Sequence, residues 1–248
     1  MAPVTAPMNF LVRDSLYDDE RPYLLIYEPP AGFPKQNIKL EKHTDLRIED
    51  IRVCKDQPSL DKNGFQITKF SSKMSRADFD NEELVKTVYL KEVVDHVQAI
   101  FGAQKVQIFE YVLRKRHEQF PISTGEPYEF NQPTSIAHVD TTHSWTEEMV
   151  KRLNPATANQ LLESRVLCVN VWKPLRGPVR DWPLALCDPL TVDTQDLHPG
   201  DLVYDDYVVE NMQLHYDDNQ NWYYISLVYL TQLFHFQKTK ILKCHEKA

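Results

Sequence analysis

His138 and Asp140 are the residues of this chain whose types and spacing point most directly to chemistry. Residues 133–142 are expected to be extended, and side chains on a strand alternate between its two faces, so His138 and Asp140 project together. An imidazole and a carboxylate on one face form two arms of a metal site. A second histidine would complete the 2-His-1-carboxylate set, which holds Fe(II) with open coordination positions. An exposed pair at a strand end has the same spacing, so this interpretation depends on the rest of the chain.

Histidines downstream of the pair are the candidates for the third ligand. His235 is the first choice because it stands on a predicted strand, although a histidine between two phenylalanines is also typical of a packed core residue. His245 and His215 are the next choices. His143 ranks below them because it falls at the start of a predicted helix. Zinc bound by the same side chains would indicate a hydrolase, but the sequence identifies no general base for that reaction.

The elements that precede the pair are predicted from hydrophobic periodicity. Apolar residues at spacings of three to five predict a helix over 80–101. Asp80 and Glu83 resemble a capping box at its start, and Gly102 is placed to end it in a left-handed conformation. Residues 105–113 then alternate as in a strand. These elements are expected to be scaffold.

The segment after the pair is predicted to turn directly into helices. Ser144 and Glu147 form a second capping box, which indicates a helix over 145–153, and a shorter helix is expected to end at Ser164. Helices inserted here would form either a lid that excludes water from a reactive metal centre or a plain surface insertion.

From residue 165 onward the pattern is that of β-structure. The predicted strands are Arg165–Trp172, Leu184–Asp188, Leu202–Val209 and Asn221–Phe236, separated by turn residues at 177–178, 199–200 and 217–219. Asn170 and Trp172 share one face and are expected to line the interior, with Val171 packed outward. Several strands without intervening helices predict a sandwich or a jelly-roll barrel, so the fold class is mainly β with flanking helices, α+β overall.

Composition excludes several classes of protein. The chain has 248 residues, 42% of them hydrophobic, and a formal net charge of −8, which argues against nucleic acid or an anionic membrane as the main partner. No run approaches the roughly 20 apolar residues that span a bilayer. Four scattered cysteines indicate free thiols. We therefore expect a cytoplasmic protein. Residues 1–63 are expected to form an extended N-terminal arm, and residues 64–248 the domain. The oligomeric state is not predicted.

A series of motifs carries a family resemblance. They are Gly64-Phe65-Gln66, Phe101-Gly102-Ala103, Ala137-His138-Val139-Asp140-Thr141, Val169-Asn170-Val171-Trp172-Lys173-Pro174-Leu175, Asp181-Trp182-Pro183 and Asn221-Trp222-Tyr223-Tyr224-Ile225-Ser226. From Gly64 to Ser226 the chain resembles the fungal hydroxylase/desaturase family of non-haem iron oxygenases. This family is related to an accessory protein of bacterial cephalosporin methoxylation.

The resemblance implies a fold, cofactors and an activity. The fold is the double-stranded β-helix, a cupin-like jelly roll. The cofactors are Fe(II), with His138 and Asp140 as two of its ligands, and 2-oxoglutarate as co-substrate. The implied activity is a dioxygenase of secondary-metabolite, including mycotoxin, biosynthesis that hydroxylates, desaturates or closes a ring in a small molecule.

The resemblance is expected to end at Ser226. Family members continue to a Pro-His segment with the second histidine ligand and to an arginine that pairs with 2-oxoglutarate, and residues 227–248 show neither. A shifted reading frame, a truncated pseudo-enzyme or a replacement ligand would each explain this difference. The alternative function is therefore a catalytically impaired, truncated member that binds a small molecule or a partner protein.

Overall fold

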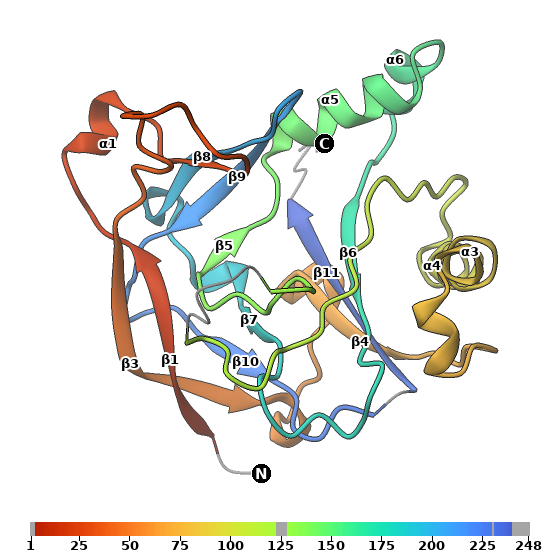
Figure 1. The fold of residues 1–248 in the computed structure, drawn as a ribbon. Helices are drawn as coiled ribbons and strands as arrows, with labels where there is room; N and C mark the ends of the chain where they lie inside the picture. The colour runs from red at the N-terminus through yellow and green to blue at the C-terminus, as the bar shows by residue number, and fades with distance from the viewer. Residues whose placement is uncertain (1–2, 123–127, 230, 240–248) are drawn as a thin grey trace, which may run out of the picture.

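The strands of the described residues form three sheets (Figure 1). The computed structural model describes residues 3–122, 128–229 and 231–239. The first sheet has the order β1 (Val4–Leu11), β3 (Leu40–Asp50), β10 (Trp222–Tyr224) and β7 (Ala185–Cys187). The second has the order β2 (Tyr23–Leu25), β8 (Leu197–Val203), β9 (Val208–Leu214) and β5 (His138–Val139). The third has the order β4 (Phe65–Lys69), β11 (Gln232–Thr239) and β6 (Cys168–Trp172).

The first two sheets are joined through β1 and the residues that lead into β5. The backbone of Asn9 exchanges hydrogen bonds with Ser135 and Ala137, at 2.8 Å and 2.9 Å. Phe10, Ala137 and Leu214 from the two sheets pack in one core cluster with Trp222. The curled β-structure therefore carries β5 inside a continuous layer, with helices outside it, as the mainly β prediction requires.

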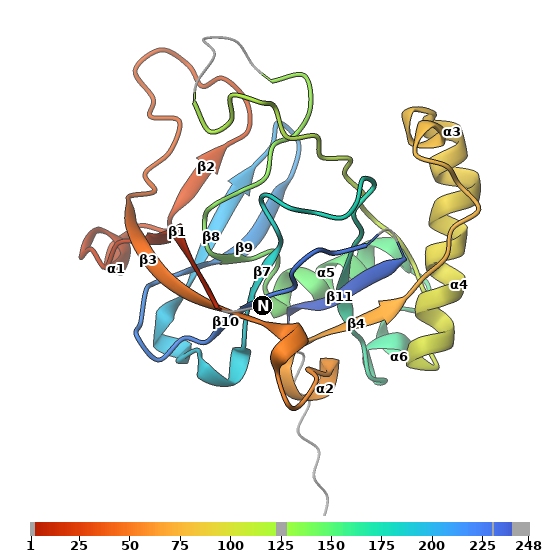
Figure 2. The ribbon, with the colours of Figure 1, turned by 90° about the horizontal axis from the view of Figure 1, so that it is seen from below.

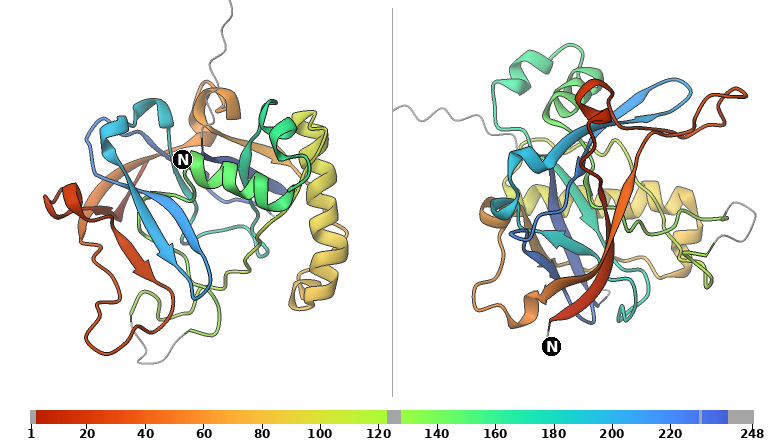
Figure 3. Two further views of the ribbon diagram at one scale, coloured as in Figure 1. Left: turned by 90° about the horizontal axis from the view of Figure 1, so that it is seen from above. Right: turned by 90° about the vertical axis from the view of Figure 1, so that its left-hand side faces the viewer.

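Helices and single helical turns flank the sheets. They are α1 (Leu16–Asp19), η1 (Ile51–Val53), α2 (Leu60–Asn63), η2 (Ala77–Asp80), α3 (Glu82–Leu84), the π-turn η3 (Val85–Tyr89), α4 (Leu90–Phe101), α5 (His143–Leu153), α6 (Ala158–Leu162), η4 (Pro189–Thr191) and η5 (Thr194–Asp196). Helix α4 lies along the third sheet, on the side of the molecule opposite β1 and β3 (Figures 2 and 3). Val93 and Val97 of α4 pack there against Leu233 and Val171 of the sheet.

The helical prediction for residues 80–101 is confirmed with one change at its start. Asn81, one residue later than predicted, caps α3 by accepting hydrogen bonds from the backbone of Glu83 and Leu84. Gly102 ends α4 with a φ of +59°, in the left-handed region that glycine adopts without a Cβ clash. No helix in the described residues is both long enough and apolar enough to cross a membrane.

The predicted strand over 105–113 is wrong. Val106 and Ile108 do face one way and pack against the α4 cluster. The described residues nevertheless contain no strand within 105–113, because the segment lacks the ladder of backbone hydrogen bonds that defines one. The alternating pattern correctly predicted which way Val106 and Ile108 face. A strand also needs a hydrogen-bonded neighbour, which the pattern does not show.

The predictions for the C-terminal β-region are partly confirmed. Trp172 packs in the interior cluster with Ile225, whereas Val171 packs under α4, as predicted. The strand predicted over 202–209 is instead the hairpin of β8 and β9. The predicted turn at Pro199-Gly200 lies inside β8, where a Cβ on Gly200 would stand 3.0 Å from Asn211 Oδ1. This glycine therefore permits close packing across the hairpin rather than a turn.

The N-terminal segment contributes directly to the sheets. β1 and β3 form an antiparallel ladder from Val4↔Ile48 to Leu11↔Leu40, and β2 runs parallel to β8. The division of the chain at residue 63 stays a prediction.

Candidate functional site

The structure brings the side chains of His138 and Asp140 together, as their spacing predicts. His138 lies on β5, paired with Gln213 of β9, and Asp140 follows directly. Nε2 of His138 is 3.3 Å from Oδ1 of Asp140, and the two side chains are 29% and 34% exposed. Both groups can therefore be reached from outside without unfolding the strand.

A backbone carbonyl fixes which nitrogen of His138 is available to a ligand. Nδ1 lies 2.7 Å from the carbonyl oxygen of Ile136. Because a carbonyl can only accept, Nδ1 must carry a proton and donate it, and Nε2 is left toward Asp140. Histidines that bind metals are commonly oriented by this kind of second hydrogen bond.

Asn170 holds the carboxylate of Asp140 from β6. Its Nδ2 donates a hydrogen bond to Oδ2, while Oδ1 faces His138. The sequence placed Asn170 on the interior face but gave it no role. Only the fold reveals the contact, because 30 residues separate the two partners.

Burial and nearby charges shift the pKa of His138 in opposite directions. Burial lowers the pKa of His138, but the hydrogen bond and the charge of Asp140 more than compensate, so that the net shift is upward. The positive charge of Arg114 acts in the opposite direction. The site thus combines one carboxylate with a nearby guanidinium.

The chain turns from the pair into α5 through a polar network centred on Glu210 of β9. Glu210 accepts hydrogen bonds from the hydroxyls of Thr142 and Ser144 and pairs with Arg21 at 2.5 Å. Burial raises the pKa of Glu210, but these three partners lower it to a net value below normal. Thr142 also caps α5, instead of the predicted Ser144, by accepting from the backbone of Trp145. The network holds the segment just beyond Asp140 against β9.

His235, the first choice for a third ligand, faces away from the pair. Phe236 pairs with Asn170 across β11 and β6, so His235 projects to the opposite face, toward α4. There Nε2 of His235 lies 2.9 Å from the hydroxyl of Thr68, and the side chain is fully buried. This corrects the choice of His235, which is a packed residue of the helix-sheet interface.

Two of the other histidine candidates, His215 and His143, are held by different partners. Nδ1 of His215 donates to the carbonyl of Leu11 at 2.8 Å in a buried position. His143 starts α5, and its Nε2 is 3.2 Å from Glu147. His245 lies outside the described residues.

The donor set of the pair fits part of an iron site. Imidazole nitrogen and carboxylate oxygen are suitable Fe(II) ligands, and both side chains are held by groups that leave Nε2 and Oδ1 facing each other. Within residues 3–122, 128–229 and 231–239, no three His, Cys, Asp or Glu side chains are grouped closely enough to hold a metal. The described chain therefore supplies two of the three expected ligands.

The chain is similar to known proteins over most of its length. A family model described as "YDMC: Oxidoreductase/YMDC permease-like domain" matches residues 8–244, and so extends beyond Ser226, where the resemblance was expected to end. An Fe(II)/2-oxoglutarate-dependent dioxygenase, nvfI, from Aspergillus novofumigatus is 32% identical over 80% of this chain and 70% of its own length. The hydroxylase/desaturase poxK of Penicillium oxalicum is 28% identical over 90% of this chain and 74% of its own.

A solved structure shows the same fold. The iron and alpha-ketoglutarate-dependent endoperoxidase NvfI superimposes with a TM-score of 0.81 and 27% identity, covering 96% of this chain and 84% of that one. The cupin-like jelly roll expected from the sequence is thereby confirmed.

Proposed function

The chain belongs to the fungal family of Fe(II)/2-oxoglutarate-dependent dioxygenases and hydroxylase/desaturases, and on this premise we propose that it is an iron oxygenase acting on a small molecule. The observation that carries the proposal is the paired and oriented His138–Asp140 site. The alternation of side chains along a strand would by itself leave both side chains free to rotate. Here the carbonyl of Ile136 holds His138, and Asn170 holds Asp140. A site built in this way is typical of a bound metal.

His138 and Asp140 would hold Fe(II), which together with 2-oxoglutarate supplies the oxygen chemistry when bound. Asn170 keeps one carboxylate oxygen of Asp140 turned away, so the other stays directed at the metal position. Arg114 provides positive charge that favours an anionic co-substrate beside the pair.

The reaction class we propose is hydroxylation, desaturation or ring formation in secondary-metabolite biosynthesis. Relatives that are named hydroxylase/desaturases support the hydroxylation and desaturation in this class. We also propose a cytoplasmic location, because the described cysteines Cys54, Cys168 and Cys187 are free thiols, as is usual in reducing compartments. Given the acidic net charge, no nucleic-acid partner is expected.

The proposal is tested by iron- and oxygen-dependent conversion of 2-oxoglutarate to succinate by the purified protein. We expect the wild type to form succinate when Fe(II) is present. The rate of succinate formation should fall to the background rate in Asp140→Ala. Asp193→Ala, which removes an exposed carboxylate from the turn before η5, is the matched control. Succinate formation that is equal in the wild type and Asp140→Ala would contradict the assigned site.

A further inference from the structure

A pocket separate from the His138–Asp140 site lies at the start of β11, away from Phe236, which pairs with Asn170. It has a volume of about 370 Å³ and is bordered by η1, the end of β4 and the start of β11. None of its lining residues belongs to the His138–Asp140 site. The volume is within the range of small-molecule sites, at the lower end of that range.

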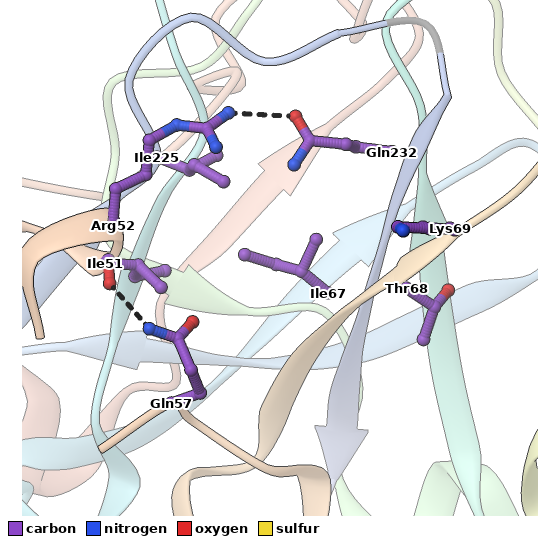
Figure 4. A pocket seen from close by; sticks show the side chains of 8 residues that line it. All are labelled: Ile51, Arg52, Gln57, Ile67, Thr68, Lys69, Ile225 and Gln232. Carbon is purple, nitrogen blue, oxygen red and sulfur yellow. Dashed lines mark hydrogen bonds between the residues drawn. The ribbon is translucent and has the colours of Figure 1, made fainter. Parts of the chain in front are cut away.

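The floor of this pocket is apolar. Ile51 and Ile225 are buried, at 1% and 3% exposure, and Ile67 lies between the polar side chains of the rim (Figure 4). Ile67 and Ile225 belong to the same interior cluster as Trp172. A ligand on this floor would therefore bury its own apolar surface against rigid core side chains.

The rim of the pocket is positively charged. Arg52 is held in place because it donates to the carbonyls of Ser226 and Leu227 and to Oε1 of Gln232. These acceptors are uncharged, so its positive charge is not neutralised by them. Lys69 is exposed, and no carboxylate among the described residues forms an ion pair with it. The described residues that line the pocket include two cations, Arg52 and Lys69, and no acidic side chain.

The amides on the rim leave hydrogen-bonding groups for a ligand. Gln232 uses its oxygen for Arg52 and for the backbone of Tyr229, which leaves its NH₂ directed toward Ile67 (Figure 4). Gln57 donates its NH₂ to the carbonyls of Ile51 and Cys54, which leaves its oxygen as an acceptor. Donors thus predominate on the side where Arg52 and Gln232 meet.

From this arrangement we propose that the pocket is a binding site for a small organic carboxylate with a short apolar body. The carboxylate would bind between Arg52, Lys69 and the NH₂ of Gln232, and the apolar body would cover Ile67. A carboxylate suits this rim because it accepts several hydrogen bonds and neutralises two cations that have no carboxylate partner among the described residues. Three isoleucines below the rim exclude a purely polar anion as the best ligand.

The test uses hexanoate as the probe and the full-length protein without iron. Binding is followed through the δ1 methyl signals of ¹³C-labelled isoleucines, assigned by Ile→Val substitution at each position. We expect the signals of Ile51, Ile67 and Ile225 to shift together and saturably. Hexan-1-ol, which has the same apolar body but no charge, is expected to bind about tenfold more weakly or worse.

Substitutions then separate the site from general effects of charge. Lys69→Gln is expected to weaken hexanoate binding by about tenfold, because one charge-assisted contact is lost. Lys62→Gln removes an exposed lysine that does not line the pocket and should bind as the wild type does. Unchanged methyl signals in the free variants establish that they are folded.

The proposal is overturned if hexanoate causes no saturable shift, if hexan-1-ol binds equally well, or if the two lysine variants lose affinity alike. Because iron is omitted, these outcomes do not depend on the proposed oxygenase activity.

Discussion

At the scale of single residues, the candidate site is defined by what holds each side chain. The carbonyl of Ile136 selects the tautomer of His138, and Asn170 selects the free oxygen of Asp140. The spacing of His138 and Asp140 was sufficient to predict that they meet. Sequence could not predict Asn170 as their partner, because β6 and β5 belong to different sheets and only the fold brings Asn170 to Asp140.

Asn170→Leu is expected to weaken Fe(II) binding by roughly 10- to 100-fold, the usual cost of losing a group that orients a metal ligand. The leucine has similar volume, so the barrel should remain folded. Anaerobic iron titration measures the effect, with Asn159→Leu on the surface of α6 as the control. Equal affinity in the wild type and Asn170→Leu would show that Asp140 needs no support.

Arg114→Gln is expected to weaken 2-oxoglutarate binding by about tenfold, because a guanidinium near the pair is lost. Lys115→Gln is the matched control, since its ammonium lies over the ring of Phe130, 4.7 Å from the ring centroid, rather than toward the site. Equilibrium binding of 2-oxoglutarate to the iron-loaded, oxygen-free protein compares the two. If both variants weaken binding alike, Arg114 has only a general electrostatic effect.

At the scale of elements, α4 and the third sheet meet at two histidines. Thr68 of β4 bridges Nε2 of His96 at 3.0 Å and Nε2 of His235 at 2.9 Å. Nδ1 of His235 is buried and has no hydrogen-bond partner. Protonation there would place an unpaired N–H in an apolar layer, and burial, together with the charge of His96, lowers the pKa of His235 to about 4.

This interface makes folding stability depend on pH. The pKa of His235 is lower in the folded protein than in the unfolded chain, where it is about 6.5. The contribution of neutral His235 to the free energy of unfolding is therefore fully present above pH 6.5 and is lost as the pH falls toward 4. The loss at the acid end is roughly 3 kcal/mol, from 1.36 kcal/mol per pKa unit. Denaturant unfolding of the wild type and His235→Leu between pH 7 and 4 measures it.

We expect the free energy of unfolding to fall less steeply with decreasing pH in His235→Leu than in the wild type. His117→Leu, at an exposed position, should keep the wild-type slope. Parallel curves for the wild type and His235→Leu would mean that His235 is not the group responsible.

At the scale of the whole molecule, the sequence predicted the mainly β fold, the long helix before the site and the helices after it. Periodicity was enough for these because each buries a definable apolar face. It could not distinguish residues 105–113, which alternate without a partner strand, from a true strand. Nor could it show that Gly200 serves packing within β8, since that follows from the approach of Asn211.

The choice of His235 as third ligand was wrong for a related reason. Sequence placed His235 on a strand, but the choice of face depends on register, and a shift of one residue reverses it. The observed pairing of Phe236 with Asn170 directs His235 to α4.

Anaerobic titration of Fe(II) into the wild type, His138→Ala and Asp140→Ala tests most directly whether His138 and Asp140 are the metal ligands. Removing either ligand takes away half of the donors that the described chain supplies, without emptying the core. We expect saturable binding of one Fe(II) to the wild type and no saturable binding to either variant, with circular dichroism unchanged. Undiminished stoichiometric binding in either variant would contradict the assignment of His138 and Asp140 as the metal ligands.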